Sequence, residues 1–225
     1  MCAASALTAW AVRGRSSAVF GPSLWRGDRR RPAVALTFDD GPSESTPELL
    51  AILAGYGAPA TFFQCGANVD RLPEVARAVR EAGHEIGNHS YSHPYFHFKS
   101  AAFMEAELAR AQRSIASATG AAPRIMRAPY GVRWPGIGRA QQTLGLRGVM
   151  WTVIGYDWKW DAGRIVNRIC RNIGNGAIIC LHDGRGLEVN PPLRQTLEAV
   201  RRMIPMIERR GLKLETVSHL LCLTN

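Results

Sequence analysis

The chain of 225 residues lacks several features that would mark particular classes of protein. No run reaches the roughly 18 apolar residues of a membrane-spanning helix, and there is no internal repeat or low-complexity tract. Its five cysteines, at positions 2, 65, 170, 180 and 222, are odd in number and never form a CxxC pair. This spacing argues against a disulfide framework or a zinc knuckle. Cys65 and Cys180 lie inside apolar runs, so we expect them to be buried free thiols.

Acidic residues are also scarce, since 18 Asp and Glu oppose 28 Lys and Arg and give a formal net charge of +10. Such a balance favours anionic partners, either nucleic acid or an anionic cell-envelope polymer. The arginines are scattered and no nucleic-acid motif accompanies them, so we expect no nucleic-acid partner. A basic, solvated surface is the simplest explanation of the charge. With 46% apolar residues, the chain is expected to be soluble and globular with a single core.

The first 32 residues differ from the rest of the chain. The stretch "MCAASALTAWAV" is apolar over 12 residues and has no basic residue before it. It resembles the end of a signal peptide or membrane anchor without meeting the description of either, and an unordered arm or a covering helix are alternatives. We therefore set residues 1–32 apart as an N-terminal arm, the only part that could attach to a membrane. An extracytoplasmic or cell-envelope location is expected, with the cytoplasm as the alternative.

From residue 33 onward, seven β-rich runs alternate with six segments of helical period. The β-rich runs are 33–38, 58–65, 84–89, 124–128, 147–153, 176–181 and 212–217. The helical segments are 45–57, 72–83, 101–120, 135–145, 162–173 and 192–211. This alternation predicts one α/β domain with a mostly parallel sheet, which could be a closed barrel or an open sheet. In either architecture, reactive groups belong at the carboxyl ends of the strands.

Reactive residues do follow five of the expected strands. They are the pair Asp39-Asp40 in "TFDDGP", His89 and His93 in "HSYSH", Arg127 in "RAPYG", Asp157 in "YDW" and His182 in "LHDG". One carboxylate and two imidazoles can supply three ligands to a divalent ion and leave positions for water and substrate. Zinc is the first expectation, although iron(II) also uses this set. The second aspartate would then be free to act as a base.

Each of these clusters has an ordinary explanation when taken alone. Paired aspartates often cap turns, two histidines four residues apart are often incidental, and His182 could be a histidine satisfied within the core. His84 and His97 are expected to be strand-start or surface residues rather than ligands. The combination of all five clusters at strand ends favours a catalytic site.

Taken in order, these motifs resemble those of the polysaccharide deacetylase family, also called the NodB-homology domain or carbohydrate esterase family 4. The resemblance covers residues 33–222 through "TFDDGP", "HSYSH", "RAPYG", "YDW" and "LHD". It implies an irregular (β/α) barrel over residues 33–225. It also implies a metal-dependent hydrolase that removes acetyl groups from an acetylated polysaccharide or oligosaccharide.

The resemblance further implies a role for each matching residue. The metal ligands would be Asp40, His89 and His93, binding Zn²⁺ or, alternatively, Co²⁺ or Mn²⁺. Asp39 would be the general base, oriented by Arg127, and the backbone N–H of Tyr130 would help to hold the oxyanion. Asp157 would keep His182 protonated as the general acid. Trp158, Leu181 and Pro129 would contact the substrate.

Several functions fit this reading of the sequence. The first expectation is an N-deacetylase that acts on a GlcNAc-containing glycan, either peptidoglycan or chitooligosaccharide. Alternatives are an O-deacetylase such as an acetylxylan esterase, a metal amidohydrolase acting on a non-sugar C–N bond, and a non-catalytic glycan-binding module. Exposed tryptophans at positions 134, 158 and 160 would favour a sugar, because aromatic faces stack on pyranose rings. The sequence does not specify the glycan, the native metal or the oligomeric state.

Overall fold

Parallel strands form one curled sheet in the computed structural model, which describes residues 3–223. The strands are β1 (Ser23–Leu24), β2 (Ala33–Gly41), β3 (Thr61–Gln64), β4 (Glu85–Asn88), β5 (Ile125–Met126), β6 (Arg147–Val149), β7 (Val153–Ile154), β8 (Ala177–His182) and β9 (Lys213–Glu215). Their order is β1-β6-β5-β4-β3-β2-β8-β7, with β9 also pairing with β2. Every pairing between these strands is parallel.

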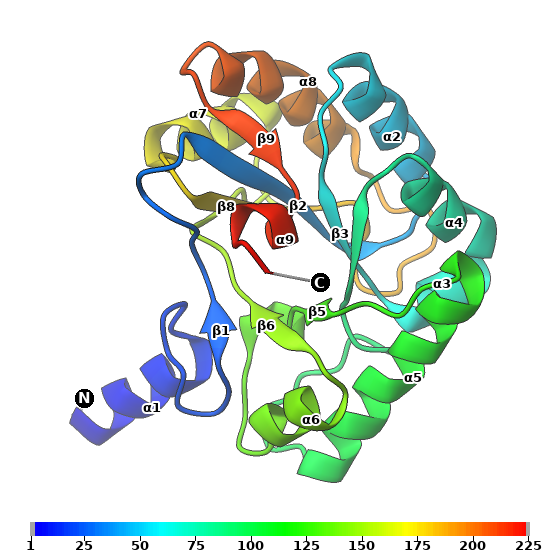
Figure 1. Cartoon of the computed structure of the whole chain (residues 1–225), viewed down its shortest axis with the longest axis vertical. Helices are drawn as coiled ribbons and strands as arrows, with labels where there is room; N and C mark the ends of the chain where they lie inside the picture. The colour runs from blue at the N-terminus through cyan, green and yellow to red at the C-terminus, as the bar shows by residue number, and fades with distance from the viewer. Residues whose placement is uncertain (1–2, 224–225) are drawn as a thin grey trace.

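Helices surround this sheet (Figure 1). They are α1 (Ala3–Arg13), α2 (Thr46–Gly55), α3 (Gly66–Arg71), α4 (Pro73–Glu81), α5 (Ala101–Thr119), α6 (Ile137–Thr143), α7 (Ala162–Asn172), α8 (Arg194–Glu208) and α9 (Val217–Leu220), with a 3₁₀ turn at Pro129–Gly131. Each of the seven expected β-rich runs contains a strand, and the predicted α/β class and irregular barrel are confirmed. One detail differs, because the run 147–153 breaks at residues 150–152 into β6 and β7.

The barrel is incomplete between β1 and β7, the two ends of the strand order. Within residues 3–223, no ladder joins these two strands. The segment after β1 closes part of the gap, since Thr152 Oγ1 donates to the Trp25 carbonyl at 2.8 Å and Arg26 forms an antiparallel bridge with Ala177. Residues just before β7 therefore meet the N-terminal segment along this seam.

The two faces of β2 differ in what they contact. Val34, Leu36 and Phe38 belong to a large apolar cluster shared with α2, α7 and α8. Ala33 and Ala35 belong to a small cluster on the other face, where Val217 and Leu220 of α9 also pack. Figure 1 shows α9 at the centre of the view with strands around it and the longer helices outside. Since strand residues alternate between faces, Thr37 and Asp39 continue the inner row toward the carboxyl end of the barrel.

Local sequence signals set the limits of the longest helix, α5. The Ser100 side chain caps its first turn by accepting from the Phe103 N–H, and Gly120 ends it in the left-handed conformation at φ 76°. Its apolar residues recur at three- and four-residue steps and turn one face inward. The buried residues on that face are Met104, Leu108, Ala111, Ile115 and Ala118.

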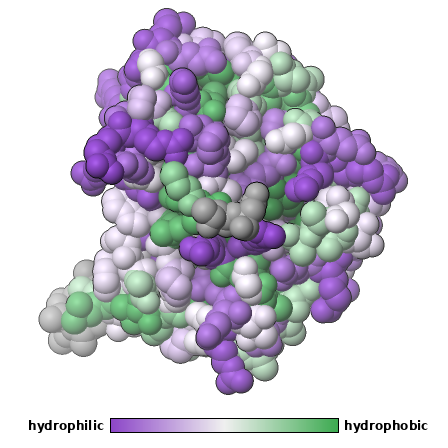
Figure 2. Space-filling model, viewed as in Figure 1, coloured by the Kyte–Doolittle hydropathy of each residue, from purple (hydrophilic) through white to green (hydrophobic). Residues whose placement is uncertain are grey.

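The N-terminal segment that the sequence sets apart contacts the barrel. Val12 belongs to the apolar cluster around α5 and α6, and β1 pairs with β6. The Arg133 guanidinium donates to the Ser17 carbonyl at 2.5 Å. Leu7 and Trp10 of α1 are exposed, and Figure 2 shows α1 as a hydrophobic projection from the molecule. Across residues 3–223, no helix has the length and apolar character needed to cross a bilayer.

Candidate active site

An irregularity at the end of β2 brings both neighbouring aspartates to one cavity. Asp39 pairs with Phe63 of β3, whereas Gly41 pairs with Gln64, so the register shifts across Asp40. Asp40 has a φ of 72°, in the left-handed region that non-glycine residues seldom adopt. On a regular strand these carboxylates would point to opposite faces. The shift removes that constraint, and both residues line the same cavity.

Gly41 is required for this turn because a buried carboxylate lies against it. A Cβ at residue 41 would lie 2.1 Å from Asp183 Oδ2. Asp183 is held in place by Thr46, whose hydroxyl donates to Oδ2 at 2.7 Å. Burial raises the pKa of Asp183 to about 7, and the neighbouring charges of Asp40 and Asp39 act in the same direction. This carboxyl therefore has little space to move and a high cost of charging.

We predict that Gly41→Ala lowers the free energy of unfolding by about 1–3 kcal/mol, the usual cost of forcing an extra carbon into a packed site. Zinc affinity should fall as well, because Asp40 is the adjacent residue. Urea denaturation and zinc titration measure the two effects. Gly55→Ala in α2 is the control, since its Cβ would meet nothing within 4 Å. Equal stability and zinc affinity in both variants would contradict the prediction.

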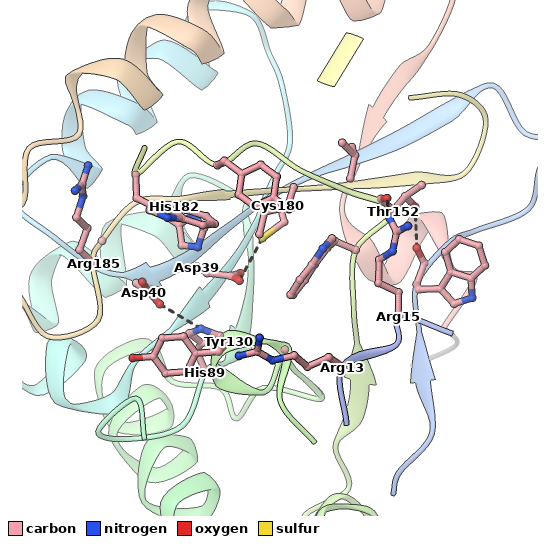
Figure 3. Close-up of a pocket in the computed structure, with 18 of the residues that line it drawn as sticks. Arg13, Arg15, Asp39, Asp40, His89, Tyr130, Thr152, Cys180, His182 and Arg185 are labelled. Atoms are coloured by element: carbon pink, nitrogen blue, oxygen red, sulfur yellow. Dashed lines mark hydrogen bonds and ion pairs between the residues drawn. The ribbon is translucent and has the colours of Figure 1, made fainter. Parts of the chain in front are cut away.

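The predicted ligand set of Asp40, His89 and His93 converges on one point. Asp40 Oδ1 lies 3.2 Å from His89 Nε2 and 3.0 Å from His93 Nε2. His89 directly follows β4, and His93 lies in the loop after it with a φ of 53°. Within residues 3–223, these three residues form one of two clusters with the donor atoms to hold a metal ion. Figure 3 shows Asp40 and His89 pointing toward each other, with a dashed line between them.

The hydrogen bonds around this set fit a divalent cation. His89 Nδ1 lies 2.8 Å from the Arg127 carbonyl, which can only accept, so Nδ1 carries the hydrogen. In the neutral ring, Nε2 then turns a lone pair toward Asp40 Oδ1, a buried oxygen without a hydrogen-bond partner within residues 3–223. Two facing lone pairs repel, and a cation bound to both would relieve that repulsion.

The charge state of Asp40 suits the same role. Burial acts to raise the pKa of the Asp40 carboxyl, but the adjacent imidazoles of His89 and His93 oppose it, and the charge of His182 adds to their effect. Together they hold this pKa well below its ordinary value. Asp40 is therefore ionised at neutral pH, as a metal ligand must be.

Asp39 is held by a buried arginine from the neighbouring motif. Arg127 Nη1 donates to Asp39 Oδ1 at 2.5 Å and to Thr37 Oγ1 at 2.8 Å. The Arg127 side chain is fully buried, and its guanidinium lies over the Phe63 ring at 4.1 Å from the centroid. Breaking a buried pair of this kind is costly, because the remaining charge loses its partner. The predicted pairing of Arg127 with Asp39 is thus present in the structure.

Cys180 contacts the other oxygen of Asp39 and was not anticipated as part of the site. Its thiol donates to Asp39 Oδ2 at 3.4 Å, and burial raises its pKa well above the ordinary value. Cys65 and Cys180 are both buried free thiols, as predicted. Cys180 and His182 are two residues apart on β8, so they share a face of the strand. That alternation was the available signal for placing Cys180 beside His182.

His182 at the end of β8 is oriented by Asp157, as the resemblance implies. Asp157 Oδ1 lies 2.9 Å from His182 Nδ1, and Asp157 Oδ2 accepts from the His182 backbone N–H at 2.9 Å. Thr196 of α8, which the motifs did not indicate, donates to Oδ2 at 2.8 Å. Burial alone would lower the pKa of His182, but Asp157, followed by Asp40 and Asp39, raises it to about 9.

Of the three residues predicted to contact the substrate, only Trp158 lines the cavity. Trp158 lines the cavity, is 45% exposed and meets the His182 ring edge-on at 5.0 Å. Leu181 is fully buried in the outer apolar cluster, because it alternates with His182 on β8. Pro129 is also buried, and neither residue lines the cavity. Tyr130 does line it, and its ring packs on His93 at 4.6 Å between centroids.

The cavity is large, about 1140 Å³, and its aromatic lining differs from the expected one. Trp134 packs on Phe20 and the cluster around α5, and Trp160 packs against the outer cluster, so the expectation of both at the site is wrong. Trp25 and Trp151 line the cavity instead, together with Trp158. The aromatic surface available to a sugar ring is therefore retained by other residues.

Comparison with known proteins agrees with this geometry. The family model described as polysaccharide deacetylase matches residues 26–149. A chitooligosaccharide deacetylase of Bradyrhizobium sp. (strain ANU 289) is 37% identical over 197 residues, which cover 84% of this chain and 90% of the relative. A crystal structure of the Bc1960 peptidoglycan N-acetylglucosamine deacetylase superposes with a TM-score of 0.83 at 28% identity, covering 89% of this chain and 92% of the other.

One similar structure is described as a pseudoenzyme of the same family. It is BA3943 from Bacillus anthracis, with a TM-score of 0.81 and 29% identity over 90% of this chain and 70% of the other. Similarity of fold is therefore a weaker argument for activity than the residues at the site. In this chain the ligand set, the aspartate–arginine pair and the histidine–aspartate pair are all present.

Proposed function

The chain belongs to the polysaccharide deacetylase family, and we propose that it removes N-acetyl groups from a GlcNAc-containing glycan and releases acetate. The single observation that carries this proposal is the convergence of Asp40, His89 and His93 beside the Asp39–Arg127 pair. The relatives named for chitooligosaccharide and peptidoglycan support a glycan of that kind as the substrate.

Amide hydrolysis needs an activated water and a polarised carbonyl, and Asp39 serves the first of these needs. A divalent ion held by Asp40, His89 and His93 would lower the pKa of water and polarise the acetyl oxygen. Asp39 takes a proton from the attacking water, and its contact with Arg127 keeps the carboxylate aimed into the cavity. General-base catalysis of this type contributes about 10²–10⁴-fold to the rate.

The other residues act on the charges that develop next. The backbone N–H of Tyr130, in a turn with φ 57°, supports the acetyl oxygen as it becomes negative, a contribution of about 3–4 kcal/mol. His182 gives its proton to the departing nitrogen, and Asp157 stabilises the charged imidazole before transfer. Acetate and a free amine are the products.

Asp157→Asn is expected to shift the alkaline limb of the pH profile. With a pKa of about 9 against an ordinary 6.5, His182 keeps its proton at neutral pH and loses it as pH rises through the higher value. Any activity that needs this proton falls over the same range. Loss of the Asp157 charge lowers the pKa, so the limb of kcat should move toward lower pH. A cation at Asp40 acts in the same direction, since like charges repel.

The measurement is kcat for acetate release between pH 6 and 10 in the zinc-loaded protein. Asp161→Asn is the control, because Asp161 is exposed and caps α7 through the Arg164 N–H at 3.0 Å. An alkaline limb that is the same in Asp157→Asn and in the parent protein would contradict the assignment of His182 as the acid.

The proposal is tested by acetate release from a panel of glycans. Chitotetraose, peptidoglycan glycan strands and acetylated xylan are each incubated with the protein, with zinc, cobalt and manganese supplied in turn. We expect release from the GlcNAc-containing substrates and the highest rate with zinc. Release from xylan alone would identify an O-deacetylase, and release from none would refute the proposal.

We also propose that the protein acts at the cell envelope, because that is where acetylated polymers of this kind are exposed. Fractionation of cells producing the complete protein tests this location. Recovery in the cytoplasmic fraction only would contradict it.

A further inference from the structure

We propose that three arginines at the seam between β7 and the N-terminal segment form a subsite for a carboxylate on a sugar next to the acetylated one. The residues are Arg15, Arg26 and Arg168, and all three line the catalytic cavity. The proposal rests on the function proposed above and narrows its substrate to an acidic acetylated glycan. Arg15 lies outside the region matched by the family model, whereas Arg26 is its first residue.

Two of these arginines are anchored to carbonyls two residues apart on the chain. A guanidinium N–H of Arg15 donates to the Thr152 carbonyl, and Arg168 Nε donates to the Ile154 carbonyl at 2.8 Å. Residues two apart in extended chain are about 7 Å from each other. Each anchor uses one N–H of a guanidinium that has five, so donors remain for a ligand.

The surroundings of Arg26 favour the binding of an anion. Its Nε is buried and has no hydrogen-bond partner within residues 3–223. Its guanidinium lies near the Trp25 ring, 5.8 Å from the centroid. Burial, followed by the positive charges of Arg29 and Arg15, lowers the pKa of Arg26. A bound anion would offset this repulsion.

The three arginines lack a neutralising acidic side chain among the residues that the structure describes. Among residues 3–223, none of them forms an ion pair with a carboxylate, although several other arginines of the chain do. Of the described residues, only Asp39 and Asp40 are acidic and line the cavity. Asp39 pairs with Arg127, and Asp40 faces the two histidines. The seam side of the cavity is therefore positively charged, and no carboxylate between residues 3 and 223 pairs with it.

The position of the cluster suits a neighbouring sugar rather than the acetyl group. Figure 3 shows Arg15 and Thr152 on the far side of Asp39 and Cys180 as seen from Asp40. Aromatic groups accompany the arginines, because Trp25 lines the cavity next to Arg26 in the chain and Arg168 stacks over Tyr156 at 4.6 Å from the centroid. A sugar ring could rest on these faces with its acidic substituent at the arginines.

Guanidinium groups select planar oxyanions, since their forked N–H donors match both oxygens of a carboxylate. In a GlcNAc polymer such a carboxylate can come from a lactyl ether or from a uronic acid. The two sources share the chemistry that the cluster recognises. They differ in where the carboxylate lies relative to the acetamido group.

The test compares substrates that differ only in charge. Acetate release is measured from a tetrasaccharide alternating N-acetylglucosamine with N-acetylmuramic acid, and from the same compound with its carboxyls converted to amides. For the parent protein, we expect a kcat/KM ratio of about ten in favour of the acid at low salt, falling as salt screens the charges. Arg15→Gln and Arg26→Gln should each lower this ratio by up to about fivefold, the upper end of what one exposed charge pair contributes.

Arg202→Gln is the matched control, because Arg202 is exposed on α8 and does not line the cavity. It should leave the ratio unchanged. A variant that is merely destabilised loses rate on both substrates and also leaves the ratio unchanged. A ratio of one in the parent protein, both for this pair and for a matched uronate pair, or the parent ratio in both cavity variants, would overturn the subsite.

A second set of measurements separates the subsite from the deacetylase proposal. A tetrasaccharide alternating N-acetylglucosamine with glucuronic acid replaces the lactyl carboxylate by a uronate, and preference for either acid over its amide supports the subsite. Tryptophan fluorescence titration with the acid and amide forms measures binding without turnover. Charge-dependent binding without acetate release would refute the deacetylase and keep the subsite. Acetate release without any charge preference would support the deacetylase and refute the subsite.

Discussion

Asp39→Asn is expected to lower kcat for acetate release by about 10²–10⁴-fold while the protein keeps its metal. The amide cannot accept the proton of the attacking water. It can still accept a hydrogen bond from Arg127, so the buried arginine keeps a polar partner. Asp40, His89 and His93 are unchanged, so zinc content by elemental analysis should match that of the parent protein.

Asp28→Asn makes the same chemical change at the surface, where Asp28 pairs with the exposed Arg30. Its kcat should equal that of the parent protein. If Asp39→Asn turned over acetylated chitooligosaccharide at the parental rate, Asp39 would not be the base.

His93→Ala is expected to lose both zinc and activity. The change removes one of three donors, and the side chain is largely buried, so no other group of the loop replaces it. Loss of a residue that only orients a ligand lowers metal affinity about 10–100-fold, so loss of a ligand should cost at least about 100-fold. Activity at limiting zinc falls with occupancy.

A thermal readout makes this test independent of catalysis. Zinc should raise the Tm of the parent protein and leave that of His93→Ala unchanged, because a ligand stabilises only a fold that binds it. His97→Ala is the control, since His97 packs on Trp134 rather than at the cavity. A zinc-dependent rise in the Tm of His93→Ala equal to that of the parent would refute the ligand set.

The alternation of apolar β-rich runs with segments of helical period predicted much of this structure, because a parallel sheet buries its strands on both faces. Short apolar runs separated by amphipathic helices leave few other folds, and polar residues at the ends of such runs must meet at one edge. The ligands Asp40, His89 and His93 could be grouped on that basis together with the family resemblance. Thr196, which donates to Asp157, lies outside the motifs and is found only when distant segments pack.

Other features depend on contacts that no local pattern specifies. The break between β6 and β7 follows from Thr152 turning to meet Trp25, 127 residues away along the chain. Trp134 was expected at the site but packs against the cluster around α5, because tertiary packing, not hydropathy, decides which aromatic side chain faces the cavity. The position of Leu181, in contrast, could have been predicted from the sequence. Neighbouring residues of a strand point to opposite faces, so Leu181 must lie on the outer face when His182 points into the cavity.

The pairing of β2 along both of its edges has a consequence for how the protein unfolds. This strand bonds to β8 on one side and to β9 and β3 on the other, and it ends in Asp39 and Asp40. Its amides can exchange with deuterated solvent only when the whole sheet opens, so they should be among the slowest in the molecule. Heat or denaturant would then abolish turnover and tertiary structure in a single step, with no partly folded, inactive species in between.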